Sequence, residues 1–420
     1  MSLDVSFLAA TVARVSAAEG SAVLIVIGII VAVVAIIYGA QQEKKAQLAW
    51  AKIAAQYGLD QTGKFDLSGK VGDFAVAADV YTTGSGKNRQ TWTRVTLTGN
   101  LTRAVALASE GFFSRVFGQD IMVGDPGFDQ TVKVQGDEAA ALALLDQHTR
   151  SAFKSAVASG WSLEDGCWTL KARGRLSEEL GSRIEVGLSL AELTKKGQSE
   201  LPRRLLALVT HDAIPNVRRR ALSYLVSQYA SSSATQSALQ AALRDGEPDV
   251  RLLAADRLGD LGVLDALVGS VAVEPRVRVE ALEAMVRHGP EDPRTSQRVS
   301  EWFNADVPHL FRKAAVEAVA RVAVVDAEAR LIEVLGAPDD DLKLAAMRSL
   351  QAVGTVHAVP FLIPYRDKLL AFTLKGAAKD AILTIQARVA HGDAGALSLA
   401  GEGGGLAMAE ALSEPSEQGG

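Results

Sequence analysis

A short apolar pattern recurs along the second half of this chain, and it restricts the possible folds more than any other feature. In each copy an apolar anchor is followed by alanine four positions later and by another apolar residue at eight. The anchors are Val217, Val250, Val277, Leu310, Leu342 and Leu374, and the alanines are Ala221, Ala254, Ala281, Ala314, Ala346 and Ala378. Consecutive anchors lie 33, 27, 33, 32 and 32 residues apart. Such a period predicts a solenoid, in which each unit holds two helices and stacking buries the apolar faces.

The copy from Pro248 to Gly262, PDVRLLAADRLGDLG, indicates the local structure of each unit. Proline suits the first turn of a helix because its missing N–H has no partner there. Val250, Ala254 and Leu261 then fall on one face at helical spacing. We expect one helix of about fourteen residues that ends at Gly262. The small alanine would let a neighbouring helix pack closely.

The pattern x-P-x-V-R-x-x-A-x-x-x-L resembles the short HEAT-like repeats first described in bilin lyases. The resemblance is clearest in GEPDVRLLAADRLGDLG and AVEPRVRVEALEAMV, and it covers roughly residues 200–390. It implies an all-α solenoid of about six helical pairs, but no particular reaction. Bilin lyases and HEAT-like DNA glycosylases are enzymatic relatives of such repeats. This stretch has few aromatic residues and no evident basic cleft, which favours neither activity.

An uncharged, apolar segment lies near the start of the chain. No charged residue occurs between Glu19 and Glu43, and residues 23–37 read VLIVIGIIVAVVAII. A helix over residues 22–40 would be about 28 Å long, which matches the hydrocarbon core of a membrane. Its valine, isoleucine and leucine residues favour insertion by about 4 to 7 kcal/mol. We therefore predict a transmembrane helix over residues 21–40 rather than a cleaved signal peptide, which would be shorter and preceded by basic residues.

The flanks of this segment predict its orientation. Arg14 precedes it, whereas Lys44, Lys45 and Lys52 follow it. The carboxyl-terminal part is therefore expected on the cytoplasmic side of a bacterial inner membrane, with the opposite orientation as the alternative. Helical spacing of apolar residues continues over residues 41–58. We expect a juxtamembrane helix there that packs against the next domain, rather than one that binds the lipid surface.

Residues 59–197 have a different texture, in which β-branched segments alternate with helical patterns. Strands are predicted at Phe74–Tyr81, Gln90–Leu97, Thr131–Val134 and Cys167–Ala172, and helices at Asp137–Asp146, Thr149–Ala158 and Leu176–Leu193. This pattern predicts an α+β domain. Its run VGDPGFDQTVKVQGD, followed by ALLDQHTRSAF, resembles an uncharacterised bacterial domain found behind transmembrane helices. That resemblance implies no known activity.

Candidate catalytic and metal-binding residues are few in this domain. The loop TTGSGKNRQ lacks the glycine and hydroxyl positions of a phosphate-binding loop and fits a hairpin turn. Asp120, Asp125, Asp129 and Asp137 lack the register of a calcium-binding loop. His148 has no serine or cysteine partner at a recognisable spacing. We expect no catalytic residue, no cofactor and no metal site. The alternative hypothesis is an enzyme of unknown reaction whose site lies in this domain.

Basic side chains mark one side of the predicted solenoid. The residue after the anchor is Arg218, Arg251, Arg278, Phe311, Lys343 or Lys375, so it is basic in five of the six copies. These side chains form either a ladder that attracts an anionic partner or, as the resemblance implies, bonds to neighbouring turns. The densest cluster consists of Arg203, Arg204, Arg218, Arg219 and Arg220. We expect it to contact the middle domain, anionic lipid or an external partner.

Residues 391–420 carry five acidic residues and no basic one, and they account for the net charge of −5. The remainder is close to balanced, which argues against a nucleic-acid-binding protein. The predicted order is an N-terminal tail (1–20), a transmembrane helix (21–40), a juxtamembrane helix (41–58), an α+β domain (59–197), a HEAT-like solenoid (198–390) and a disordered acidic tail (391–420). We predict a membrane-tethered scaffold that binds a protein partner, with no nucleic acid or small-molecule ligand.

Overall fold

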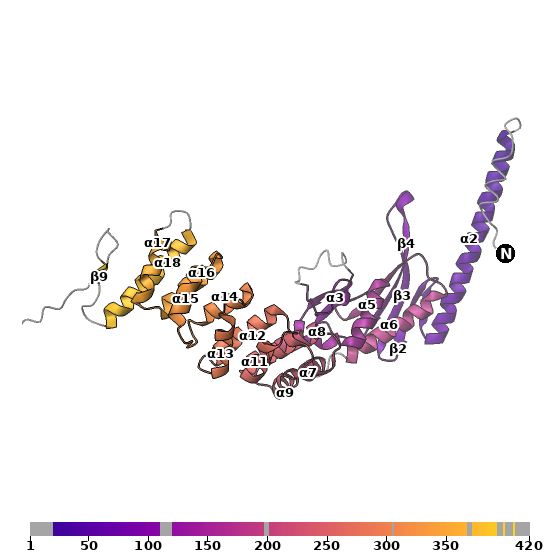
Figure 1. The fold of residues 1–420 in the computed structure, drawn as a ribbon. Coiled ribbons are helices and arrows are strands. Elements are labelled where there is room, and N and C mark those ends of the chain that lie inside the picture. The colour runs from indigo at the N-terminus through magenta and orange to yellow at the C-terminus, as the bar shows by residue number, and fades with distance from the viewer. Residues whose placement is uncertain are drawn as a thin grey trace, which may run out of the picture. The chain divides into compact units, whose positions relative to one another are not determined.

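The structure, a computed structural model, describes residues 20–109, 120–196, 201–304, 306–367, 372–392, 398–399 and 406–407 (Figure 1). The chain forms two compact units, Met1–Tyr229 and Ala230–Gly420. The predicted repeat region, 198–390, therefore begins inside the first unit. Its first two helices, α7 (Leu201–His211) and α8 (Pro215–Gln228), belong to the unit that contains the β-sheet.

The first described helix, α2 (Gly20–Tyr57), is continuous, so the predicted transmembrane and juxtamembrane helices are one element. Its part from Ile27 onward is long and apolar enough to cross a membrane, and the apolar stretch is not buried by the rest of the protein. From Ala46 onward one face is buried. The helix therefore combines an apolar end that the described residues leave exposed and an end that packs on the sheet domain.

Trp50 anchors the second half of α2 to the sheet domain. Its indole N–H donates a hydrogen bond to the carbonyl oxygen of Leu176 at 2.7 Å. Its ring meets the ring of Phe65 edge-on, with centroids 5.5 Å apart. About two helical turns after Trp50, the Tyr57 hydroxyl lies 2.9 Å from the Glu185 carboxylate. These contacts agree with the expectation that this segment packs against the next domain.

The sheet domain contains eight antiparallel strands in the order β1-β2-β3-β4-β8-β7-β5-β6. The strands are β1 (Asp60–Gly63), β2 (Asp66–Val71), β3 (Phe74–Thr83), β4 (Gln90–Thr98), β5 (Val105–Ala108), β6 (Lys133–Gly136), β7 (Trp161–Glu164) and β8 (Cys167–Arg173). The predictions for β3, β4 and β8 are confirmed, and that for β6 is displaced by two residues. The short strands β1, β2, β5 and β7 were not predicted, because four to six residues carry little alternation.

Four helices complete the sheet domain: α3 (Pro126–Asp129), α4 (Glu138–Leu144), α5 (Gln147–Ala158) and α6 (Glu179–Lys196). Asp137 and Asp146 cap α4 and α5 by accepting backbone N–H groups. Helix α6 packs on β3, β4 and β8. Gly187 lets it approach, because a Cβ atom there would collide with Leu97 and Trp161. The α+β prediction for this region is thus confirmed in its element types.

The second unit is helical apart from one short ribbon among its described residues. Its helices are α9 (Ser233–Ala242), α10 (Pro248–Leu258), α11 (Leu261–Gly269), α12 (Pro275–His288), α13 (Pro293–Trp302), α14 (His309–Ala318), α15 (Ala327–Leu335), α16 (Asp340–Val353), α17 (Val359–Arg366) and α18 (Phe372–Gly392). The helices that hold the anchors pack in succession, α10 on α12, α12 on α14, α14 on α16 and α16 on α18. The Ser349 hydroxyl, for example, donates to the Val316 carbonyl at 2.7 Å inside the core.

The prediction of one helix from Pro248 to Gly262 is wrong at its end. Helix α10 stops at Leu258, because Gly259 adopts the left-handed conformation (φ 66°) that suits glycine after a helix. Asp260 then caps the next helix by accepting the N–H groups of Gly262 and Val263 at 3.0 and 3.1 Å. Leu261 therefore belongs to α11.

The anchor of the fourth repeat is also one residue away from the predicted position. Leu310 is 47% exposed, whereas Phe311 and Ala315 are buried. The five other anchors are all buried. The fourth anchor is therefore Phe311, and the residue after it is Arg312. With this correction a basic residue follows the anchor in every copy.

The predicted disordered tail, 391–420, lies largely outside the described residues, as does the tail over residues 1–19. Where the structure describes it, His391 and Gly392 end α18, and Ser398–Leu399 and Leu406–Ala407 form an antiparallel pair, β9 and β10. The two short strands belong to the two similar sequences GALSLAGE and GGLAMAEA.

Candidate partner-binding site

Three of the basic residues that follow the anchors bond to nearby main-chain carbonyl groups. Arg218 donates to Asp212 O at 2.9 Å, Arg251 donates to Asp245 O at 2.6 Å, and Arg278 donates to Val268 O at 2.9 Å. These carbonyl groups lie at or just after the end of the preceding helix, where they have no partner within that helix. A cation is also favourable there because the dipole of the helix is negative at that end. These three side chains therefore serve the fold rather than an anion-binding ladder.

The cluster Arg203, Arg204, Arg218, Arg219 and Arg220 is largely used inside the first unit. Arg204 donates to Ala143 O at 2.7 Å and lies 3.4 Å from the Asp146 carboxylate. Arg220 pairs with Glu138 at 2.7 Å. Contact with the middle domain was one of the three expected roles of this cluster. Arg203 and Arg219 lie on the surface.

A buried ion network joins α7 to the sheet domain. The Arg150 guanidinium donates to both carboxylate oxygens of Asp212 at 2.9 Å and to Asp125 at 3.0 Å. The side chains of Arg150 and Asp212 are only 3% and 1% exposed. Burial acts to lower the pKa of Arg150, but the bonds to Asp212 and Asp125 outweigh it and raise that pKa. Sequence reasoning missed this network, because Arg150 lies 25 residues from Asp125 and 62 residues from Asp212.

Three of the four candidate metal-binding aspartates, Asp120, Asp129 and Asp137, have structural partners. Asp120 pairs with Lys133 at 3.0 Å, and Asp137 caps α4. The Asp129 carboxylate accepts the N–H groups of Val123 and Gly124, both at 3.0 Å. Burial raises the pKa of Asp129 despite these bonds. Within the described ranges, no group of three or more His, Cys, Asp or Glu side chains could hold a metal ion.

The two residues of the enzyme hypothesis that remain are Asp125 and His148. Asp125 caps α3 by accepting the Phe128 N–H group, and it also bonds to Arg150. His148 lines a hollow of about 500 Å³ between α5 and α7, together with Asp146 and His211. None of the side chains around this hollow is a hydroxyl or thiol, the usual groups that histidine activates as nucleophiles. The residues around this hollow therefore do not include a serine, threonine or cysteine nucleophile that His148 or His211 could activate.

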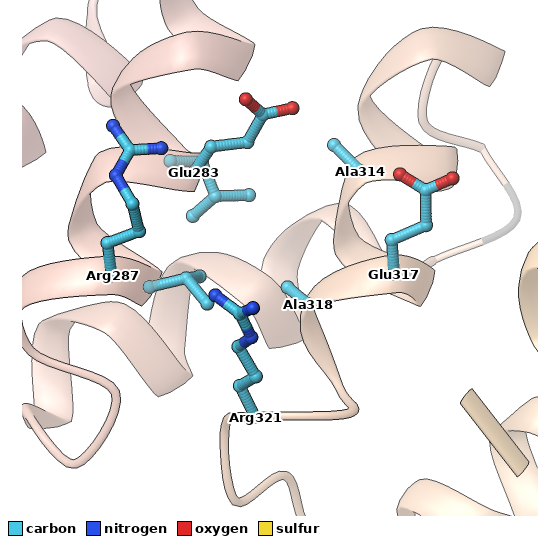
Figure 2. A pocket seen from close by; sticks show the side chains of 8 residues that line it. Glu283, Arg287, Ala314, Glu317, Ala318 and Arg321 are labelled. Carbon is cyan, nitrogen blue, oxygen red and sulfur yellow. The ribbon is translucent and has the colours of Figure 1, made fainter. Parts of the chain in front are cut away.

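A hollow of about 330 Å³ lies between α12 and α14 in the second unit (Figure 2). It is lined by Leu282, Glu283, Val286 and Arg287 from α12, and by Ala314, Glu317, Ala318 and Arg321 from α14 and the turn after it. We call it the α12–α14 groove. In the corrected register Glu283 and Glu317 each lie six residues after their anchors, and the two arginines lie ten after. Equivalent positions of two repeats thus form its two walls.

The charges of the α12–α14 groove are only partly neutralised. Arg287 pairs with Asp256 of α10 at 2.8 Å. By contrast, Glu283, Glu317 and Arg321 form no ion pair within 4 Å with any side chain that the structure describes. Burial raises the pKa of Glu283; Arg287 opposes this shift, and Glu280 and Glu317 add to it.

Figure 2 shows the side chains of Glu283 and Glu317 on neighbouring helices at the two sides of this hollow, with Arg321 near Ala318. Leu282 and Ala318, which also line it, are buried apolar residues. The groove therefore combines an apolar floor with two carboxylates that form no ion pair with the described residues. Comparisons with models of known protein families and with curated proteins found no match to this chain.

Proposed function

We propose that this protein is a single-pass, membrane-tethered scaffold whose helical pairs form a HEAT-like solenoid that binds a protein partner. The successive packing of the anchor helices α10 to α18 supports the solenoid. The exposed apolar part of α2 supports the tether. Because the other half of α2 is docked on the sheet domain, the tether and the first unit would move as one body.

The partner contributes an extended segment with a lysine or arginine flanked by apolar side chains, which lies in the α12–α14 groove. The observation that carries this proposal is the pair Glu283 and Glu317, two carboxylates above an apolar floor that form no ion pair with the described residues. A cation placed between them would oppose the effect of burial, which raises the pKa of Glu283, and would offset the smaller contribution of Glu317. Arg321 would donate hydrogen bonds to a neighbouring acidic side chain of the same segment.

The orientation in the membrane belongs to this proposal as well. Lys44, Lys45 and Lys52 follow the apolar segment, and they favour a cytoplasmic location in a bacterial inner membrane for both units. A reporter fused after Gly58 shows on which side of the membrane the two units lie. We expect a reporter that works only in the cytoplasm to be active there. Activity of a reporter that works only after export would show the opposite orientation, and it would not affect the proposal for the groove.

Cross-linking from within the groove tests the partner hypothesis. A photoreactive amino acid replaces Ala318 in the full chain, and cross-linked peptides are identified after irradiation of intact cells. We expect one cross-linked partner segment that contains Lys or Arg, and its yield should fall at least fivefold in the variant with Glu283→Gln and Glu317→Gln. Glu291→Gln, an exposed acid in the turn after α12, is the control. Equal yields in the double variant and the control would sink the proposal.

A further inference from the structure

A third pocket, rich in basic side chains, lies at the edge of the sheet domain next to α2. Its volume is about 560 Å³. Its walls include three cations (Lys64, Arg89 and Arg175), two aromatic residues (Phe65 and Tyr81) and one carboxylate (Asp66). We call it the basic pocket. Cations thus outnumber carboxylates among its lining residues, although the chain as a whole is acidic.

The contacts of α2 place this pocket close to the end of the apolar segment. The Lys64 ammonium lies 3.4 Å from the carboxylate of Glu43. Glu43 follows Ala40, where the apolar segment ends, by three residues, which is about 4.5 Å along a helix. The Arg175 guanidinium lies 4.3 Å from the centre of the Phe65 ring, and the same ring packs on Trp50 of α2. The Lys64 side of the pocket is therefore close to the headgroups when α2 crosses a membrane.

The hairpin formed by β3 and β4 supplies another wall of the basic pocket. The pairing of β2 with β3 ends at Asp66 and Asp79, and that of β4 with β8 ends at Trp92 and Arg173. Beyond these pairs the hairpin continues without a neighbouring strand, as Figure 1 shows. The Val80 N–H group donates to Phe65 O, so the free part of the hairpin starts beside the residue that contacts α2.

The aromatic residues of the hairpin fit a membrane interface. Tyr81 and Trp92 are paired across the two strands, and the Trp92 indole donates to the Thr83 hydroxyl at 3.0 Å. Both side chains are partly exposed. Tyrosine and tryptophan are enriched at the level of lipid headgroups, because their rings are apolar and carry one polar group.

We propose that the basic pocket binds the phosphate of an anionic phospholipid in the leaflet from which α2 emerges. In the part of the chain that the structure describes, Arg89 and Arg175 form no ion pair. Arg89 donates one hydrogen bond, to the Thr82 hydroxyl at 3.4 Å, and Arg175 lies over the Phe65 ring, so neither guanidinium group is paired with a carboxylate there. The planar guanidinium group can donate two parallel hydrogen bonds to one phosphate. The proposal rests on α2 crossing a membrane, but it depends neither on which side the units face nor on the α12–α14 groove.

Native mass spectrometry of the detergent-solubilised full chain tests this site. We expect phosphatidylglycerol to be retained in preference to phosphatidylcholine. Arg175→Gln and Arg89→Gln should each weaken retention about fivefold, from the contribution of one basic residue near an anionic headgroup. Arg257→Gln, an exposed arginine on α10, is the control. Equal retention of the two lipids, or equal retention by the variants and the control, would overturn the proposal. Displacement of the lipid by an equal concentration of inorganic phosphate would show a site for soluble phosphate and overturn the lipid assignment.

A fluorescent label tests the height of the pocket independently. Cys167 is the single cysteine and lies at the end of β8 opposite to Arg173, away from the hairpin. One protein carries the label at Cys167, and a second carries it at the hairpin tip after Cys167→Ser and Ser85→Cys. In nanodiscs that contain a headgroup quencher, the label at position 85 should be quenched and the label at position 167 should not. Equal quenching at the two positions would refute the placement. Extraction of the chain from membranes by alkaline carbonate would instead reject the tether.

Discussion

The substitution Asp212→Asn tests whether the first helical pair is part of the sheet domain. It removes the charge that faces Arg150 inside the protein and leaves the guanidinium with Asp125 alone. Breaking a buried ion pair by removing one partner costs about 3 to 5 kcal/mol. Asp125 is then the one carboxylate that still compensates the buried charge of Arg150. For a unit of this size, about 2 to 4 °C of melting temperature are lost per kcal/mol. We therefore expect the first unit to melt about 6 to 20 °C lower.

The assay uses the solubilised full chain and two readouts. Tryptophan fluorescence reports mainly on the first unit, since four of the five tryptophans belong to it. Hydrogen exchange then locates the change, which should appear in α5 and α7. Asp79→Asn is the matched control, because Asp79 also accepts two hydrogen bonds from one arginine, Arg94, but at the surface. Such exposed pairs contribute less than about 1 kcal/mol.

A loss of stability for Asp212→Asn no larger than that for the control would refute the reasoning. A second test removes both charges together. The double variant Arg150→Met and Asp212→Leu should recover much of the loss, since a well-packed apolar pair of similar volume avoids the desolvation of both ions. A double variant as unstable as Asp212→Asn would mean that the hydrogen bonds of Arg150 to main-chain groups, such as Leu145 O, matter more than the ion pair.

Three further predictions concern the repeats and their boundary. Phe311→Ala should lower the free energy of unfolding of the second unit by about 3 to 5 kcal/mol, whereas Leu310→Ala should change this free energy by less than about 1 kcal/mol. Denaturant unfolding measures both, and comparable losses would reject the corrected register. Burial raises the pKa of Glu283, so the folded chain keeps this proton to a higher pH than the unfolded chain does, and stability falls as pH rises through that raised pKa. The affinity for the cross-linked partner segment should therefore increase over the same pH range in calorimetric titrations, and Glu283→Gln should make it independent of pH there. A chain that ends at Tyr229 should give a cooperative melting transition, and one that ends at residue 197 should not, because the shorter chain lacks Asp212; cooperative melting of both would contradict the shared core.

The proposed lipid site and the docked half of α2 have a joint consequence for the scaffold. Trp50 and Tyr57 hold α2 against the sheet domain, and the basic pocket would add a contact between the sheet domain and the membrane surface. The first unit would then keep a fixed height above the membrane rather than swing on a flexible linker.

The local pattern of the sequence was sufficient for the helices and for the apolar faces that they bury. Proline at the helix starts and the 3.6-residue spacing are properties of single segments, so the anchor helices could be predicted without knowledge of their neighbours. The same holds for α2, because twenty uncharged residues suit a membrane whatever follows them. The longer strands β3, β4 and β8 were found for the same reason.

Tertiary structure decided which of two adjacent apolar residues is buried and which charges are free. Leu310 and Phe311 are both apolar, and only the packing of Phe311 on Trp302, with ring centroids 4.6 Å apart, selects the register. Arg204 and Glu283 are both charged residues on helices, but Arg204 donates to a carbonyl group of α4, whereas Glu283 lines a groove and forms no ion pair with the described residues. These differences arise from residues that are distant in the chain, and a periodic pattern carries no information about them. The sequence therefore determined the helices, while long-range packing determined their surfaces and the place of the first pair beside the sheet.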